Sequence, residues 1–312
     1  MNEPNTDFVI ETKGLTRYFG RKAAVLDVSL GVPRGGVFVL LGRNGSGKTT
    51  TIRMLLGLLS PTRGSSTVLG CDSMRLTPEI RSRIGYLAEG HFAYGWMRVR
   101  EQAWFQSHSF PRFNQGVFDA VAGHFGLDPD ARARTLSRGQ RAGLCLALTL
   151  ATEPELLILD DPALGLDPVA RRALVEALLA VTQHRDRTIL LSSHFLDDVE
   201  RVADRIAIFD GGVLRVCASV DSFRERLGRW VLRFERLPPR IGEIPGLVHC
   251  RTVDDELHVT VANPNAATEA ALSRLGATSV SRAPLGMENA VIDYLERRAR
   301  VGSLLQVVGG AS

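Results

Sequence analysis

The chain has 312 residues, of which 45% are hydrophobic and 23% charged, and its mean hydropathy is close to zero (+0.02). This composition is typical of a globular protein and excludes intrinsic disorder, a collagen-like fibre and a protein with many membrane spans. The formal net charge is +4, and only Lys13, Lys22 and Lys48 are lysines among 38 basic side chains, which leaves 35 arginines. Such a bias favours a genomic coding preference over a nucleic-acid-binding patch.

The sequence shows no export signal and no membrane-spanning segment. Its first residues, MNEPNTDF, have neither the basic region nor the apolar region of a signal peptide. The longest apolar runs, such as Leu144–Ala151, fall far short of the ~20 residues that a helix needs to cross a bilayer. We therefore expect a cytoplasmic protein, and four widely spaced cysteines without a CxxC pair favour reduced thiols.

The first 216 residues divide into three consecutive stretches. Residues 7–90 indicate strands and turns that lead into one glycine-rich loop and a helix, and residues 91–150 have mainly helical patterns. Residues 151–216 alternate apolar strands with helices, which predicts a parallel sheet covered by helices. The strands expected there are Leu156–Leu159, Thr188–Ser192 and Arg205–Phe209, and the helices are Pro168–Val181 and Phe195–Val202.

A different pattern begins after the turn DGG at 210–212, where short alternating segments replace the earlier strand–helix alternation. The elements expected there are strands at Trp230–Glu235, Leu247–Thr252 and Glu256–Val261, and helices near Ala266–Leu275 and Met287–Arg300. His249, Cys250 and His258 lie on two of these strands without the spacing of metal ligands. We therefore expect no metal site in this part of the chain.

A glycine-rich loop after the strand VFVLL carries the pattern G-x4-G-K-[ST]. Glycines let backbone N–H groups approach phosphate oxygens, which a Cβ would block, and the following helix offers its N-terminal dipole to the anion. We expect Lys48 to reach the β- and γ-phosphates and the Thr49 hydroxyl to ligate Mg²⁺. The residues expected to bind nucleotide here are Gly42, Arg43, Asn44, Gly45, Ser46, Gly47, Lys48, Thr49 and Thr50.

A pair of aspartates follows the apolar strand ELLIL. Asp160 stands at the end of that strand, where a carboxylate can hold Mg²⁺, and Asp161 follows in a position to orient the attacking water. Many buried strands end in aspartate, but an upstream phosphate loop favours a site of nucleotide hydrolysis.

Residues 8–216 carry a motif set whose order resembles that of ATP-binding cassette (ABC) ATPases. The segment LSRGQ resembles the family signature LSGGQ, and GLDP resembles the loop that joins two subunits, with Asp167 at its centre. The resemblance implies a head-to-tail dimer, with a second copy or a paired ATPase subunit, that holds two ATP molecules with Mg²⁺ between its subunits. The signature residues implied to bind ATP held by the other subunit are Ser137, Arg138, Gly139 and Gln140.

The resemblance also implies roles within one chain. Phe19 matches the aromatic residue that stacks on adenine, and His194, in LLSSH, matches the histidine that binds the γ-phosphate. Glu89 stands where most members have a glutamine that senses Mg²⁺ and the attacking water. The catalytic residues implied are Lys48, Glu89, Asp161 and His194, and the metal ligands are Thr49, Glu89 and Asp160.

Four residues depart from the family pattern. Arg43 replaces a common proline, Arg138 a signature glycine, and Glu89 the usual glutamine. Asp161 stands where the family has glutamate, and its side chain is shorter by one C–C bond, about 1.5 Å. Because a misplacement of ~1 Å can slow a reaction on the order of 10²-fold, we expect slow hydrolysis unless the loop shifts to compensate.

The fold implied is an α/β P-loop NTPase core with a helical subdomain, plus a small C-terminal α+β accessory domain. We expect the ATPase domain over residues 7–220, with the helical subdomain at about 91–150. The accessory domain is expected over 221–300 and a flexible tail over 301–312. Within the accessory domain, only LGMENAVIDYLERR resembles anything known, the C-terminal helix of bacterial ABC-2-type exporter subunits.

The segment His91–Gln106 resembles the part of such subunits that receives the coupling helix of a separate membrane permease. Its aromatic cluster can also form the core of the helical subdomain, and we expect Tyr94, Trp96 and Met97 to lie nearer the partner. The overall pattern resembles the ATP-binding subunits of bacterial ABC-2-type exporters, which implies a place on the cytoplasmic face of the inner membrane.

Two alternatives remain. Non-transport ABC ATPases of DNA repair carry long coiled coils between phosphate loop and signature, whereas 89 residues separate Lys48 from Ser137 here. The arginines are spread and matched by 34 acidic residues, so we expect no nucleic-acid partner. The other alternative is a cassette that binds ATP as a switch with slow or negligible turnover, which Asp161 and Glu89 keep open.

Overall fold

The computed structural model describes residues 7–182, 187–194, 201–235 and 243–296. Its contacts divide the chain into two compact units, Met1–Cys217 and Ala218–Ser312. The division falls three residues before the domain boundary expected from the sequence. The tail expected over 301–312, and most of the helix expected over Phe195–Val202, lie outside the described residues.

The first sheet of the first unit is antiparallel. Its strands are β1 (Phe8–Phe19), β2 (Lys22–Pro33), β4 (Arg63–Val68) and β5 (Cys71–Asp72), in the order β2-β1-β4-β5. In the hairpin of β1 and β2, Phe19 pairs with Lys22. Gly20 in the turn has a φ of 57°, a left-handed conformation that glycine adopts without a steric cost. The hairpin therefore places Phe19 and Lys22 side by side at its tip.

The second sheet has six strands in the order β10-β9-β3-β8-β7-β6. Their bounds are β3 (Gly36–Leu41), β6 (Ile84–Leu87), β7 (Leu156–Asp160), β8 (Thr188–Ser193), β9 (Arg205–Asp210) and β10 (Val213–Ser219). The pairs from β9 through β6 are parallel. β7 and β8 are buried throughout, as expected for a parallel sheet covered on both faces. The carboxyl ends of β3, β8 and β7 meet at one edge.

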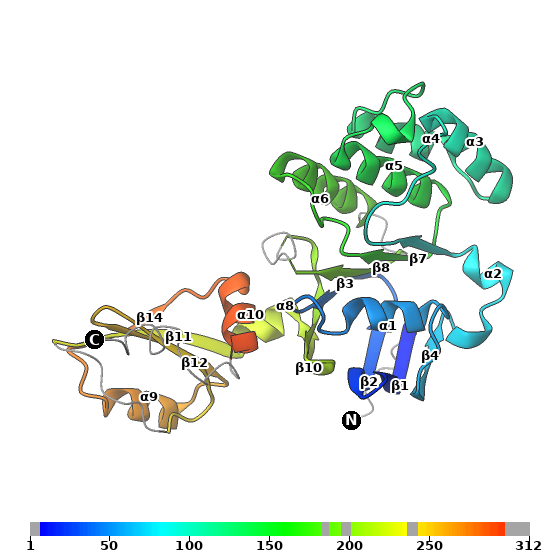
Figure 1. Ribbon diagram of the computed structural model, residues 1–312. Helices are drawn as coiled ribbons and strands as arrows, with labels where there is room; N and C mark the ends of the chain where they lie inside the picture. Colours follow the sequence, from blue (N-terminus) through cyan, green and yellow to red (C-terminus); the bar gives the residue numbers. More distant parts are fainter. Residues whose placement is uncertain (1–6, 183–186, 195–200, 236–242, 297–312) are drawn as a thin grey trace, which may run out of the picture. The chain divides into compact units, whose positions relative to one another are not determined.

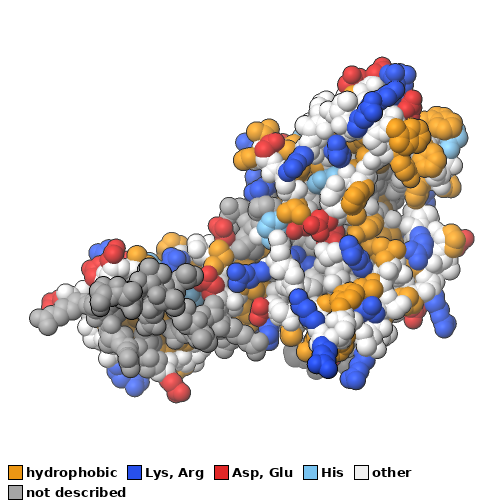
Figure 2. Space-filling model, in the orientation of Figure 1, with side chains coloured by type: hydrophobic (Ala, Val, Ile, Leu, Met, Phe, Trp, Pro, Cys, Tyr) orange, Lys and Arg blue, Asp and Glu red, His pale blue; other side chains and the backbone are white. Residues whose placement is uncertain are grey.

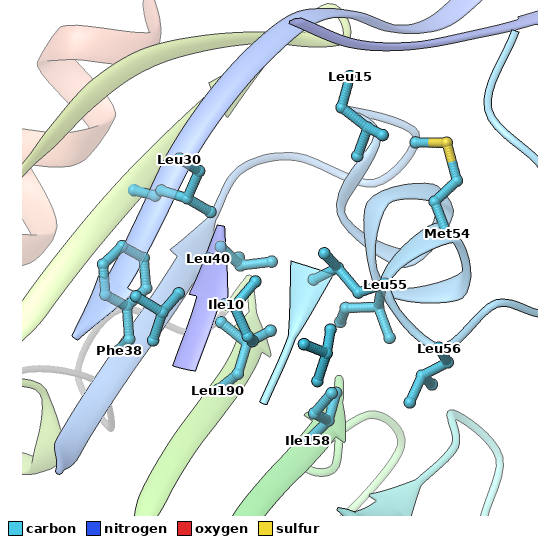
Figure 3. Close-up of a cluster of buried hydrophobic side chains, with 14 of the residues drawn as sticks. Ile10, Leu15, Leu30, Phe38, Leu40, Met54, Leu55, Leu56, Ile158 and Leu190 are labelled. Carbon is cyan, nitrogen blue, oxygen red and sulfur yellow. The ribbon is translucent and has the colours of Figure 1, made fainter. Parts of the chain in front are cut away.

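The main core of this unit forms where helix α1 (Lys48–Leu55) meets both sheets. Figure 3 shows Ile10 from β1, Leu40 from β3 and Leu55 from α1 in one cluster, and all three are fully buried. Burial of a leucine-sized side chain contributes about 1.5–3 kcal/mol. This packing fixes the start of α1 against the sheet, and the glycine-rich loop lies directly before it.

The first unit has further helices among its described residues. They include α2 (Pro78–Arg81), α3 (Val99–Ser109), α4 (Gln115–His124), α5 (Arg138–Ala151) and α6 (Pro168–Thr182), with short 3₁₀ turns at Ser73–Arg75 and Ala133–Thr135. α3 to α6 lie together in Figure 1, and a separate apolar cluster holds α3, α4 and α5 together. α5 begins at a capping box in which the Ser137 hydroxyl and the Gln140 side chain bond to each other's backbone N–H.

The second unit contains one antiparallel sheet in the order β12-β13-β11-β14. Its strands are β11 (Leu227–Arg233), β12 (Leu247–Val253), β13 (Glu256–Ala262) and β14 (Ser279–Ala283), and its helices are α8 (Val220–Glu225), α9 (Ala266–Ser273) and α10 (Met287–Glu296). Trp230, Leu232 and Val259 belong to its core. The α/β core, the helical subdomain and the α+β unit agree with the expected fold class.

Three elements of the second unit differ from the expectation. β11 begins at Leu227, three residues before the predicted strand, and neither α8 nor β14 was predicted. β14 has the sequence SVSRA, and four of its five residues are exposed, so it carries almost no hydrophobic signal. The strand therefore forms because its backbone pairs with β11, and its side chains contribute little.

Candidate nucleotide site

The glycine-rich loop connects β3 to α1, and its backbone adopts conformations that favour glycine. Gly42, Gly45 and Gly47 have φ values of 153°, 77° and 105°. A Cβ on Gly42 would lie 2.4 Å from the Phe209 carbonyl oxygen, and a Cβ on Gly47 would lie 2.6 Å from that of Ala24. The loop is therefore wrapped so closely by neighbouring backbone that side chains at these positions do not fit.

Lys48 begins α1 and curls into the loop. Its ammonium donates hydrogen bonds to the carbonyl oxygens of Gly42 (2.7 Å) and Arg43 (3.3 Å), and only 6% of the residue is exposed. Burial lowers the pKa of Lys48, while the nearby carboxylates of Asp161, Asp160 and Glu89 act in the opposite direction. The loop thus holds a compact positive charge where the phosphates of a nucleotide would lie.

Asp160 and Thr49 are positioned to share a divalent cation. Asp160 Oδ1 accepts hydrogen bonds from the hydroxyls of Thr49 (3.0 Å) and Ser192 (2.7 Å). Asp160 Oδ2 is buried without a hydrogen-bond partner among the described residues, and only 1% of Asp160 is exposed. A buried carboxylate oxygen without a partner next to a hydroxyl suits a hard cation such as Mg²⁺, so the residues present fit this metal.

Asp161 lies next to His194, from the end of β8. His194 Nδ1 and Asp161 Oδ2 are 2.7 Å apart, and the Asp161 N–H donates to the Ser192 hydroxyl (2.8 Å). Burial raises the pKa of Asp161, while His194 and Lys48 act to lower it. Its φ of 47° is uncommon for a residue with a side chain. Asp161 Oδ1 has no hydrogen-bond partner among the described residues, so one carboxylate oxygen is held by His194 and the other is available.

These residues surround a pocket of about 420 Å³. Its lining residues are Phe19, Lys22, Ala24, Asn44, Gly45, Gly47, Lys48, Thr49, Thr50, Glu89 and Asp161. Half of Phe19 is exposed, and the Arg17 guanidinium lies over its ring at 4.9 Å, which braces an aromatic surface in the pocket wall. Lys22 and Ala24 were not identified from the sequence, although the rarity of lysine in this chain was a signal for Lys22.

The signature segment lies elsewhere. Ser137 and Arg138 are exposed, and Gly139 packs so closely on α6 that a Cβ there would lie 2.6 Å from the Ala170 Cβ. Asp167 is exposed and accepts hydrogen bonds from the N–H groups of Val169 and Ala170 (both 2.9 Å). Within the described part of this chain, none of the signature residues lines the nucleotide pocket.

An exposed aromatic patch covers part of the helical region. It consists of Phe92 (83% exposed), Tyr94 (57%), Trp96 (70%), Trp104 (62%) and Phe105 (46%). Figure 2 shows hydrophobic side chains gathered at the surface over α3. The expectation that Met97 faces outward with Tyr94 and Trp96 is wrong, because Met97 is 9% exposed.

The reason for the buried Met97 is local pairing. The Met97 carbonyl accepts a hydrogen bond from the Ala133 N–H (3.0 Å), and Arg98 forms a bridge with Arg132. These backbone contacts hold the segment around Met97 against residues 132 and 133, and its side chain is buried.

Comparison with known proteins identifies the family. Residues 25–164 match the ABC transporter family. The chain is 33% identical over 229 residues to the bacitracin transport ATP-binding protein BcrA of Bacillus licheniformis, an alignment that covers 73% of this chain and 74% of the relative. It is 36% identical over 231 residues to the daunorubicin/doxorubicin resistance ATP-binding protein DrrA of Streptomyces peucetius, with 72% and 69% covered.

A solved ATP-binding subunit of an ABC transporter has the same fold, with a TM-score of 0.62 and 27% identity over 70% of this chain and 92% of that chain. Within the described ranges, no helix has the length and apolar character needed to cross a membrane. The resemblance to ABC ATPases is confirmed: the chain belongs to the ABC transporter family and is an ATP-binding subunit that hydrolyses ATP.

Proposed function

We propose that this chain drives export through a separate ABC-2-type membrane permease, on the cytoplasmic face of the inner membrane. The names of its relatives, which describe bacitracin transport and resistance to daunorubicin and doxorubicin, support a transport role. The single observation that carries the proposal is the pocket in which Lys48, Thr49 and Asp161 converge while an exposed aromatic patch remains outside it.

In the proposed site, ATP lies with its adenine against Phe19 and its phosphates on the glycine-rich loop. Lys48 donates to the β- and γ-phosphates, where its charge offsets theirs. Thr49 and Asp160, with Glu89 at the pocket wall, would hold Mg²⁺, which supplies further neutralisation of the phosphate charge when bound.

Asp161 and His194 perform the proposed chemistry at the γ-phosphate. Asp161 orients the attacking water through Oδ1, while its Oδ2 is held by His194 at 2.7 Å. Because aspartate is one C–C bond shorter than glutamate, the carboxylate stands about 1.5 Å further from the phosphate, and we propose slow hydrolysis. Removal of charge from Asp161 in this arrangement would leave the water without a carboxylate that can take up its proton.

The second half of the proposed site comes from another subunit. Ser137 is exposed and caps α5, Gly139 lies in the first turn of that helix, and neither residue lines the pocket of its own chain. The N-terminus of α5, with its positive dipole end and backbone N–H donors, can bind the γ-phosphate of ATP that is held by a second copy or a paired ATPase subunit. ATP would then join the two subunits.

The proposed docking site for the permease is the aromatic patch. Coupling would occur there because the patch runs from Phe92, three residues after Glu89 at the pocket, to Phe105 on α3, within one stretch of chain. Exposed clusters of large apolar side chains are typical of interaction surfaces, and tryptophan and tyrosine are frequent anchors in protein interfaces.

Co-expression with a tagged permease of the ABC-2 type tests the proposal. We expect the two proteins to purify together from membranes, and Trp96→Ala to reduce the recovered ATPase subunit by about tenfold, since interface tryptophans contribute on the order of 1–2 kcal/mol or more. Leu58→Ala is the matched control, because Leu58 is 60% exposed and lies outside the patch. Failure of the wild-type chain to bind any such permease would contradict the export role.

A further inference from the structure

The wall of the pocket that faces the glycine-rich loop is formed by the β1–β2 hairpin, through Phe19, Lys22 and Ala24. Two of the three lysines of this chain, Lys22 and Lys48, therefore line one pocket, in a sequence with 35 arginines. Lys22 forms no ion pair or side-chain hydrogen bond with any residue that the structure describes, and it is exposed. Its charge is thus free to meet a ligand.

The position of Lys22 follows from the contact between β2 and the loop. The Ala24 carbonyl oxygen lies so close to Gly47 that a Cβ there would approach it to 2.6 Å. Lys22 and Ala24 are two residues apart on β2, so their side chains share one face of the strand, about 6.6 Å from each other along its axis. An extended lysine side chain reaches roughly 6 Å, which is enough for its ammonium to return to the loop.

The hairpin register decides which part of ATP Lys22 meets. Phe19 and Lys22 are directly paired across the strands, so their Cβ atoms lie about 5 Å apart. A base stacked on Phe19 has its ribose and first phosphate next to Lys22. Lys48 is bound deeper, between the carbonyls of Gly42 and Arg43.

The charged residues that line the pocket favour the same placement of ATP, with its first phosphate next to Lys22. Glu89 and Asp161 line the deep end together with Lys48, whereas the end near Phe19 has Lys22 as its charged lining residue among those described. If the triphosphate extends from the adenine at Phe19 to the deep end of the pocket, its α-phosphate lies next to the Lys22 ammonium.

We propose that Lys22 is a second phosphate-binding lysine, which contacts the α-phosphate of ATP from the hairpin side while Lys48 contacts the β- and γ-phosphates. The inference rests on the binding mode given under the proposed function. It separates two kinds of contact: Lys48 binds the γ-phosphate that is released on hydrolysis and the β-phosphate from which it is cleaved, and Lys22 binds the α-phosphate next to the ribose.

The test measures the equilibrium affinity of the full chain for ATP and for ADP by titration calorimetry. We expect Lys22→Gln to weaken both nucleotides by about tenfold, with a smaller ratio at high salt, since salt screens exposed charges. Lys22→Arg, which keeps the charge, should remain within about threefold of the wild type, because arginine also binds phosphate. Lys13→Gln is the matched control, since Lys13 is paired with Glu11 (3.4 Å) and does not line the pocket.

Several outcomes would overturn the inference. One is an affinity of Lys22→Gln within twofold of the wild type for both nucleotides. Another is an equal loss in Lys22→Arg and Lys22→Gln, which would indicate a role of the side-chain shape in the hairpin. Lys48→Gln separates this failure from that of the proposed site: if Lys48→Gln also binds ATP normally, the nucleotide site itself is wrong.

Discussion

Buried polar side chains have different surroundings in the two units of the chain. In the second unit they satisfy one another: Thr260 donates to Asp293, Asp293 pairs with His249 at 3.3 Å, and Arg229 donates to His258 at 3.1 Å. In the first unit, three buried side-chain oxygens near the glycine-rich loop have no hydrogen-bond partner among the described residues. These oxygens are Ser46 Oγ, Asp160 Oδ2 and Asp161 Oδ1.

This difference distinguishes buried polar groups that stabilise the fold from buried polar groups that bind a ligand. A buried polar atom without a partner costs about 1–3 kcal/mol, so its presence near a phosphate loop indicates a ligand that completes the bonding. The described part of the second unit has no such buried side-chain atom. Its network, which includes both histidines of the strands β12 and β13, therefore stabilises that unit.

The largest effect is expected from Lys48→Arg, which keeps the charge of the loop. The ammonium is enclosed by two backbone carbonyls, and the wider guanidinium fork does not fit there. We expect phosphate release to fall on the order of 10²–10³-fold. Lys13→Arg is the control, with wild-type turnover expected. Wild-type turnover in Lys48→Arg would show that the glycine-rich loop is not the nucleotide site, and would contradict the functional role of the first unit.

Gly47→Ala should weaken ATP binding by about 10–100-fold, because the new Cβ meets the Ala24 carbonyl and the φ of 105° is strained for alanine, a cost of ~1–3 kcal/mol. Gly276→Ala is a matched control in the second unit: its φ is 72°, and nothing lies within 4 Å of the added Cβ. Calorimetric titration with ATP compares the two variants. Equal effects on ATP affinity would show that the wrapped loop is not the binding element.

Asp293→Ala tests the second unit. It leaves Thr260 and His249 without their buried partner, and we expect it to destabilise this unit by about 2–3 kcal/mol. Urea unfolding of the full chain gives the change in stability, while ATP affinity should stay within twofold. Glu269→Ala, at an exposed position of α9, should change stability by less than ~0.5 kcal/mol. Loss of ATP binding in Asp293→Ala would contradict a purely structural network.

Asp161→Asn is expected to stabilise the first unit slightly, in a pH-dependent way. Burial raises the pKa of Asp161 above its usual 3.8, so the folded state binds this proton more tightly than the unfolded state. The resulting penalty is absent below the unfolded pKa and complete above the folded pKa. Removing it should raise Tm near pH 7 and leave Tm unchanged below pH ~3.8, where the carboxyl is protonated in both states. An increase of the same size at both pH values would indicate another cause.

The sequence alone predicted the local parts of the site. The glycine-rich loop was predictable because its chemistry lies in eight consecutive residues, Gly42 to Thr49, and the fold class was predictable from strand–helix alternation. The contact between Asp161 and His194 joins residues 33 apart. Asp161 was predicted from its place after an apolar strand, whereas His194 was identified only through the family resemblance.

Other features depend on tertiary pairing and escaped prediction. Lys22 lines the pocket because the hairpin register places it opposite Phe19, which no local pattern indicates. Met97 has the apolar character of an interface residue, yet its backbone is bonded to Ala133 and its side chain is buried. β14 is exposed and short, so its pairing with β11 outweighs its weak strand propensity.

The central claim is that Asp161 Oδ1, a buried carboxylate oxygen without a hydrogen-bond partner among the described residues, performs the chemistry of the first unit. The most direct measurement is the steady-state ATPase rate of the wild type, Asp161→Glu and Asp161→Asn at saturating ATP and Mg²⁺. We predict that Asp161→Asn loses on the order of 10²-fold or more and that Asp161→Glu exceeds the wild type, because the longer side chain recovers the missing 1.5 Å. A wild-type rate in Asp161→Asn, together with no gain in Asp161→Glu, would contradict the account.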